Sequence, residues 1–173
     1  MLKTRLLITL VIFSAAFCAM DCSKSSRPEP VDPTFYVNLT PAEVVADVGD
    51  TLTLTGSINS VEGLFAISFD LVFDTTVVVF ESLSMPSNGI LGQNAIGFSA
   101  EIDSGISVSL GRTQTAGNDN VSASGVLFEA DFAVVGTGET EIQYRDVYII
   151  DEDGAENTDL ENLLLRSTII TVR

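Results

Sequence analysis

The clearest pattern in the chain is a strict two-residue alternation over residues 64–74. One set of alternate positions carries large apolar side chains: Phe65, Ile67, Phe69, Leu71 and Phe73. The other set carries smaller or more polar side chains: Ala66, Ser68, Asp70 and Val72. A period of two is typical of a β-strand with one face on a core, whereas a helix would mix the two sets around its circumference. The segment is therefore predicted to be a core strand whose other face points outward.

Similar short apolar or alternating segments recur along the chain, separated by turn-forming residues. Further strands are predicted over 35–39, 44–46, 51–55, 77–80, 95–102, 106–110, 126–134, 140–144, 147–150 and 163–172, with loops over 57–63, 84–93 and 112–124. After residue 33 no segment longer than a few residues shows a helical period. Short strands with turn signals between them predict an all-β sandwich.

The alternation also predicts which side chains of two later strands face outward. In 106–110 the outward positions are Ser107 and Ser109, and in 126–134 they are Leu127, Glu129 and Asp131. The small outward residues of the strands, such as Ala66, Ser68, Ser107 and Ser109, are predicted to leave a flat, lightly decorated sheet face. Such a surface is covered either by solvent or by a partner.

The first part of the chain has the pattern of an export signal followed by a tether. A basic start, Met1 to Arg5, precedes an apolar run from Leu6 to Phe13. The run is shorter than the roughly 18 residues expected of a spanning helix, so residues 1–22 are predicted to be a signal peptide, with a retained membrane anchor as the alternative. Residues 23–33, rich in proline and small polar residues, are predicted to be a flexible linker, and 34–173 the folded domain.

Cys22 follows the apolar segment and precedes the polar tether, which resembles the bacterial lipoprotein pattern. The three residues before it are Ala, Met and Asp, whereas the pattern usually has Leu, a small residue, then Gly or Ala. Two alternatives therefore stay open: lipidation at Cys22, with membrane contact only through that anchor, or a cleaved and freely secreted protein.

Charge and composition narrow the function classes. The chain has 24 acidic and 8 basic residues, a formal net charge of −16, and no histidine or tryptophan. This balance argues against nucleic acid and anionic membrane surfaces as partners, because both are bound through Lys and Arg. The two cysteines, Cys18 and Cys22, precede the domain, so it has no disulfide and no thiolate chemistry. Without histidine, Ser-His and Cys-His nucleophiles and histidine-based metal centres are absent, and no enzyme activity is expected.

Three segments together resemble the cohesin domain family. Residues 61–78 have a glycine before the strand, alternating apolar residues, then an aromatic–Asp pair and a turn. Residues 48–54 contain the Gly-Asp-Thr opening of that family, and residues 124–132 resemble its Gly-Val-Leu strand after a long loop. No one of these motifs is highly specific, but their order and spacing over 35–172 are characteristic of the family.

The resemblance implies a nine-stranded jelly-roll β-sandwich with its first and last strands side by side. Cohesins are non-catalytic and hold the dockerin modules of polysaccharide-degrading enzymes, so the family is associated with carbohydrate binding and polysaccharide catabolism. By this resemblance the partner-binding residues are expected to be Ala66, Ser68, Asp70, Ser107, Ser109, Leu127, Glu129 and Asp131. The implied setting is extracellular or at the cell envelope.

The sequence departs from the well-studied cohesin pattern on this face. Family members that bind dockerin tightly often carry Asn and Asp where this chain has Ala66 and Ser68, and an acidic residue where it has Arg112. The resemblance implies that, in those family members, these polar groups form hydrogen bonds with the dockerin helices. A divergent dockerin-like or different protein partner is therefore expected.

The residues alone allow three other interpretations. The acidic loop from Asp151 to Asp159 has oxygen ligands for calcium but lacks the full EF-hand ladder, so a solvated turn and no cofactor are predicted. Direct polysaccharide binding usually uses exposed aromatic rings, for which Tyr36, Tyr144 and Tyr148 are the candidates. A purely structural envelope domain is the remaining alternative.

Overall fold

The computed structural model describes residues 35–113, 121–151, 153–155 and 162–173. The predicted signal peptide, Cys22 and the linker lie outside these residues. The chain divides into two units, Met1–Val31 and Asp32–Arg173, and the strands of the described residues belong to the second. Within the described part of the chain, no helix has the length and apolar character needed to cross a membrane.

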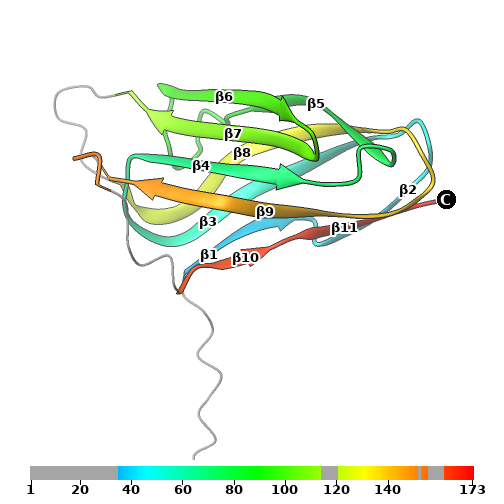
Figure 1. Ribbon diagram of the computed structural model, residues 1–173. Helices are drawn as coiled ribbons and strands as arrows, with labels where there is room; N and C mark the ends of the chain where they lie inside the picture. The colour runs from blue at the N-terminus through cyan, green and yellow to red at the C-terminus, as the bar shows by residue number, and fades with distance from the viewer. Residues whose placement is uncertain (1–34, 114–120, 152, 156–161) are drawn as a thin grey trace, which may run out of the picture. The chain divides into compact units, whose positions relative to one another are not determined.

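The second unit is a sandwich of two β-sheets (Figure 1). The five-stranded sheet has the order β10–β1–β3–β8–β5, built from β10 (Leu164–Arg166), β1 (Tyr36–Thr40), β3 (Thr51–Leu64), β8 (Val121–Val134) and β5 (Val78–Ser84). The six-stranded sheet has the order β2–β11–β9–β4–β7–β6, built from β2 (Glu43–Ala46), β11 (Thr168–Val172), β9 (Gly138–Ile150), β4 (Ala66–Val72), β7 (Gly105–Arg112) and β6 (Ala95–Ile102). The predicted all-β sandwich is confirmed.

The first and last strands each cross from one sheet to the other. β1 pairs in parallel with β10 in the five-stranded sheet, and β2 pairs in parallel with β11 in the six-stranded sheet. The crossing points lie together, since the Thr168 hydroxyl donates to the Pro41 carbonyl oxygen at 2.8 Å. With β1–β2 and β10–β11 each counted as one strand, the described residues form nine strands, as the cohesin resemblance implies.

The core is centred on the strand with the strict alternation. On β4, Ile67 and Phe69 are each 1% exposed and Leu71 is fully buried, which confirms the predicted inward face. The ring of Phe69 stacks on Phe128 of the facing sheet at 5.3 Å and meets Tyr144 edge-on at 5.1 Å. Aromatic pairs of this geometry add to the free energy of area burial, so this strand fixes how the two sheets pack.

At two places where the sequence predicts an interruption between strands, the structure has one continuous strand with a β-bulge. The predicted loop over residues 57–63 is part of β3, which stays paired with β8 through register shifts at Gly56/Ser57, Ile58/Val61 and Val61/Leu64. The predicted strands 140–144 and 147–150 are one strand, β9, with a register shift opposite β4. Gly, Ser and Asn favour turns, but a long neighbouring strand can keep such a segment in the ladder as a bulge.

Candidate docking face

Five of the eight predicted partner-binding residues lie together on the outer face of the six-stranded sheet. Across the β4–β7 ladder, Ser68 lies opposite Ser109, and Asp70 lies opposite Ser107. Ala66 lies opposite Gly111 in the same ladder. Directly paired residues of antiparallel strands point to the same face, so these side chains form one small-residue floor.

The three predicted residues of β8 do not belong to this face. β8 lies in the five-stranded sheet, so Glu129 and Asp131 point out of the opposite side of the sandwich. Leu127 is only 1% exposed, because the bulge at Gly56/Ser57 changes the alternation of β8 there and turns its side chain into the core. The single surface predicted from these strands is therefore wrong for β8.

Asp131 instead holds a polar network on the opposite face. Its carboxylate accepts hydrogen bonds from the Thr53 hydroxyl at 2.7 Å and the Ser82 hydroxyl at 2.8 Å. These two donors, Thr53 first, hold the pKa of Asp131 below its ordinary value of 3.8. The residue thus ties β8 to both of its neighbouring strands, β3 and β5.

Exposed aromatic and aliphatic side chains flank the small-residue floor on both sides. On β6, Phe98 is 70% exposed and lies opposite Ser109, and Ile96 lies opposite Gly111. On β9, Tyr148 is 48% exposed and lies opposite Ser68. We call this surface the docking face and define it by Ile96, Phe98, Ser107, Ser109, Gly111, Ala66, Ser68, Asp70, Arg145 and Tyr148.

A bulge in β9 sets the position of Tyr148. Asp70 lies opposite Arg145 but Ser68 lies opposite Tyr148, so Asp146 and Val147 together span the position of Phe69. Asp146 takes a left-handed conformation, with φ of 48°, at this point. Aspartate tolerates that conformation better than most side chains. The local Arg-Asp pair, which the sequence pattern marked as a break between two strands, therefore aims Tyr148 outward beside Ser68.

The dimensions of the docking face suit a helix. Phe98 and Tyr148 are separated by three strand-to-strand steps, from β6 through β7 and β4 to β9, or about 14 Å. An α-helix with its side chains is about 10–12 Å across. Serine, glycine and alanine between the two aromatic residues leave room for such an element to approach the sheet closely.

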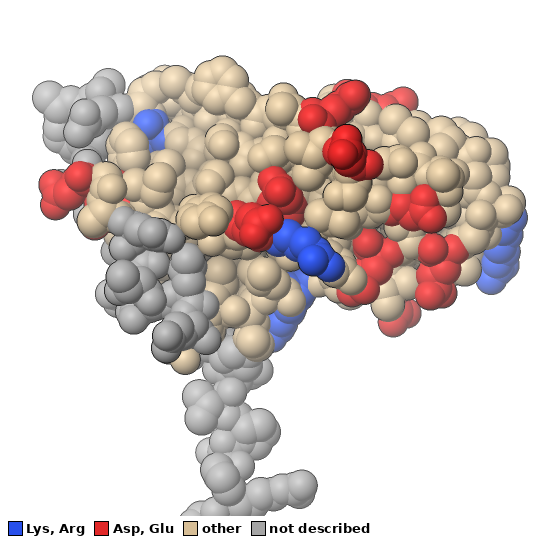
Figure 2. Space-filling view, viewed as in Figure 1, with Lys and Arg blue, Asp and Glu red and all other residues tan. Residues whose placement is uncertain are grey.

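Charge is unevenly distributed over this side of the molecule. Figure 2 shows a broad area without charged side chains over the left and middle parts of β6 and β7 and the neighbouring part of β4, with a basic group at its left edge and acidic groups gathered toward the other end of the molecule. Glu139 and Glu141 on β9 and Glu43 on β2 are exposed acidic residues of this sheet. Asp70 and Arg145, opposite each other in the ladder, lie between the two regions. Phe98 and Ile96 lie on β6, the outermost strand of this sheet.

The described residues contain no group of three or more His, Cys, Asp or Glu side chains that could hold a metal ion. Much of the acidic loop from Asp151 to Asp159 lies outside the described residues, so the prediction for it stays a prediction. In the described part, Asp151 Oδ1 accepts the backbone N–H groups of Asp153 and Ala155 at 3.0 and 2.8 Å, which closes a local turn.

The three tyrosines considered for sugar binding have different environments. Tyr144 is 5% exposed, and its hydroxyl donates to the Asn38 carbonyl oxygen at 3.3 Å. Burial raises the pKa of Tyr144. The Tyr36 ring is covered by the Arg166 guanidinium, 4.2 Å from its centroid. Only Tyr148 among them offers a large exposed ring surface, and it lies on the docking face.

The described residues form a two-sheet β-sandwich with an exposed sheet face of small residues, which aromatic side chains flank on both sides. The chain belongs to the cohesin family: it matches the Cohesin domain over residues 37–166. No curated protein matches the chain.

Solved cohesin structures have the same fold. A non-cellulosomal cohesin from the archaeon Archaeoglobus fulgidus is similar with 17% identity over 81% of this chain and 90% of that chain, at a TM-score of 0.61. The OlpC cohesin of Clostridium thermocellum, solved as a type I complex with a dockerin, shows 16% identity over 80% and 94%, at 0.63. The OlpA cohesin of the same organism, also in complex with a dockerin, shows 19% over 81% and 99%, at 0.63. At these identities the likeness shows the fold alone.

Proposed function

We propose that this protein is an exported, non-catalytic docking module that binds a dockerin-like protein partner through the docking face. The observation that carries the proposal is the row Phe98–Ser109–Ser68–Tyr148, which places two exposed aromatic rings on either side of a flat serine floor. Aromatic side chains supply much of the binding free energy at protein interfaces, and small residues allow close backbone approach. The dockerin complexes of two similar cohesins support a dockerin-like partner.

The proposed contact relies on apolar burial more than on hydrogen bonds. Ala66 and Ser68 stand where the family pattern often has longer polar side chains, and Phe98, Ile96 and Tyr148 supply the exposed apolar area. The partner is therefore expected to present an apolar helix face with small or aliphatic residues facing β4 and β7. This chemistry distinguishes a divergent dockerin from one that recognises Asn and Asp on the cohesin.

The cellular setting is part of the same proposal. Export by residues 1–22, with Cys22 as the lipidated residue, would hold the domain at the cell envelope on the tether 23–33. A dockerin-bearing, polysaccharide-degrading enzyme would then be retained at the surface. Radiolabelled palmitate incorporation into the wild-type protein, absent in Cys22→Ala, tests the anchor separately from the docking face.

The experiment that tests docking is calorimetry with purified modules that carry duplicated calcium loops, taken from proteins of the same organism. Saturable one-to-one binding to the wild-type protein, lost on calcium removal from the module and on Ser109→Arg, is expected. Absence of binding by every such module would overturn the dockerin-like partner. The matched control is Ser84→Arg, an exposed serine on β5 in the other sheet.

Direct polysaccharide binding is the second candidate, and one observation favours it. Phe98 and Tyr148 are exposed rings on one flat face, and ring faces pack against the C–H groups of sugars. Retardation in affinity gels containing plant or bacterial glycans, abolished by Phe98→Ala together with Tyr148→Ala, would support this function. If the protein is not retarded in these gels and binds no dockerin-like module, a purely structural envelope domain is the remaining hypothesis.

A further inference from the structure

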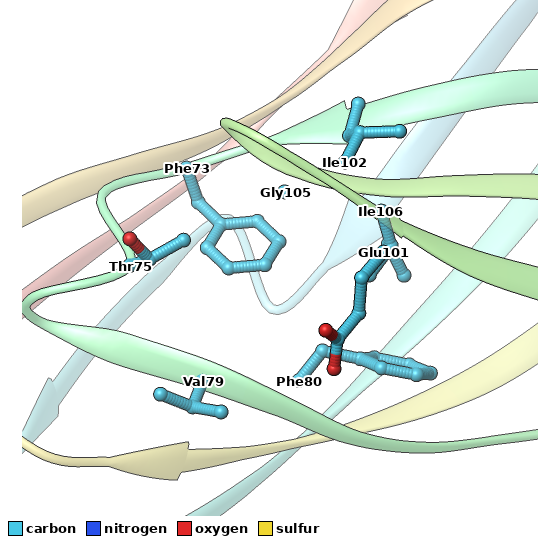
Figure 3. Close-up of a pocket in the computed structure, with 8 residues that line it drawn as sticks. All are labelled: Phe73, Thr75, Val79, Phe80, Glu101, Ile102, Gly105 and Ile106. Carbon is cyan, nitrogen blue, oxygen red and sulfur yellow. The ribbon is translucent and has the colours of Figure 1, made fainter.

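A cleft opens on the side of the sandwich where β5 faces the β6–β7 hairpin. Each sheet ends there, with β5 and β6 as the outermost strands, and the two strands are in contact. The cleft has a volume of about 180 Å³, and its lining includes Phe73, Val79, Phe80, Glu101, Ile102 and Ile106 (Figure 3). Sites for whole small molecules are usually about 300–1,000 Å³. The cleft is therefore the size of a single side chain.

The apolar walls of the cleft are held by the core. The rings of Phe73 and Phe80 both pack edge-on against Phe132, with centroid distances of 5.3 and 5.9 Å. Phe132 itself is fully buried. Because the two rings are already fixed by this contact, little conformational entropy is lost when a ligand enters between β5 and β6.

Glu101 gives the cleft its charge. It is the one ionisable residue of the lining, and its side chain extends from β6 toward β5 across the mouth (Figure 3). A carboxylate beside aromatic rings suits a cation on an apolar stem, since the ring faces and the carboxylate both attract the positive group. A lysine side chain has this form. The net charge of −16 adds a long-range attraction for a basic partner.

We propose that this cleft accepts a lysine side chain of the protein partner. The inference rests on the proposed function, because β6 carries both Phe98 on the docking face and Glu101 at the cleft mouth. A partner seated on the docking face reaches the cleft by passing around the β6 edge. Its lysine is then held at a high effective concentration, which compensates for the small area that the cleft buries.

The test uses two small probes that differ only in charge, added to the isotope-labelled protein. The first is Nα-acetyl-lysine methylamide, and the second is the norleucine analogue, which keeps the apolar stem without the ammonium group. NMR shift changes are expected at Phe73, Val79, Phe80, Ile102 and Ile106, with the lysine probe binding about five to ten times more tightly than the norleucine probe. Equal shifts from both probes, or none, would overturn the inference.

Two exposed-site variants sharpen the result. Glu101→Gln is expected to remove the preference for lysine while leaving the weak norleucine shifts unchanged. Val79→Trp, at a position 42% exposed on the rim, is expected to block both probes. If Glu101→Gln keeps the preference, Glu101 serves only as a charge that keeps the β6 edge from pairing with another strand. These measurements need no partner protein. The lysine cleft can therefore be refuted while docking is confirmed, and docking can be refuted while the lysine cleft is confirmed.

Discussion

Ser68 and Ser109 lie directly opposite each other at the centre of the docking face, on strands β4 and β7. Neither side chain is large enough to keep a partner backbone away from the sheet. Phe98 follows on one side of this pair and Tyr148 on the other. The pair is thus the floor of the proposed interface, and the aromatic residues are its sides.

The first prediction concerns this floor. Ser68→Arg or Ser109→Arg places a long, charged side chain where the partner must approach closely. We expect partner affinity to fall by roughly thirtyfold or more, the effect of losing a central contact worth about 2 kcal/mol. Calorimetry measures the change. Ser84→Arg, the same substitution on the other sheet, should leave Kd unchanged, and equal losses in all three variants would refute the assignment of the face.

The second prediction separates binding from stability at Phe98. Its side chain is 70% exposed, so Phe98→Ala should change the free energy of unfolding by no more than about 0.5 kcal/mol. Partner affinity should nevertheless fall by roughly tenfold or more, because an exposed aromatic ring at an interface edge is buried on docking. Thermal unfolding and calorimetry on the same preparation test both parts. A lowered Tm with unchanged Kd would show that Phe98 is structural.

Alternation along a single strand predicted the inward and outward sides of β4 and β7 well. This prediction needed only the local two-residue period, and the buried Phe69 and the exposed Ser109 both agree with that period. It could not assign a strand to a sheet, because that depends on contacts between distant parts of the chain. Glu129 and Asp131 do point outward, but from the opposite sheet. Leu127 is buried through a bulge that leaves no local signal in the sequence.

Phe98 and Tyr148 show a different limit. An outward phenylalanine on an edge strand looks like a core residue in the sequence, since the apolar set of a strand is normally inward. The sequence signal for an outward Phe98 lies in the alternate positions of the same strand. These positions carry Gly97, Ser99 and Glu101, which are too small or too polar to fill a core. Gly97 packs there against Met85, whose Cε lies 3.0 Å from the position of an added Cβ. The outward position of Tyr148 depends on the bulge at Asp146. The sequence pattern indicated this position only as a break between two predicted strands.

The third prediction tests the packing of β3 against β8 in the five-stranded sheet. A Cβ added at Gly56 would lie 2.1 Å from Cε1 of Phe128, so Gly56→Ala forces this buried ring to move. Overpacking of this kind costs about 1–3 kcal/mol, or roughly 5–10 °C in Tm. Gly111→Ala is the matched control, because its added Cβ would meet Ala66 Cβ at an ordinary 3.5 Å. Calorimetric unfolding of both variants distinguishes them, and similar Tm values would contradict the described packing.

The fourth prediction concerns pH. The lowered pKa of Asp131 means that its charged form is favoured in the folded state, chiefly by the Thr53 hydroxyl and then by the Ser82 hydroxyl. The associated stability is present above the ordinary pKa and is lost as pH falls through the lowered pKa. Thr53→Val should therefore raise the pKa of Asp131 toward 3.8, as measured by NMR titration of its carboxyl carbon. Thr55→Val, opposite Glu129 on β3, should leave that titration unchanged.

The fifth prediction joins the backbone of β9 to partner binding. Asp146 is held at a φ of 48°, a left-handed conformation that β-branched side chains strongly resist. Asp146→Val should therefore lower the free energy of unfolding by about 1–2 kcal/mol and, by disturbing the bulge, shift Tyr148 from its place beside Ser68. Asp146→Gly, which adopts the same φ without steric cost, should keep both stability and affinity. Thermal unfolding and calorimetry with the partner would decide. If Asp146→Val loses stability but not affinity, the bulge shapes the fold without positioning Tyr148 for docking.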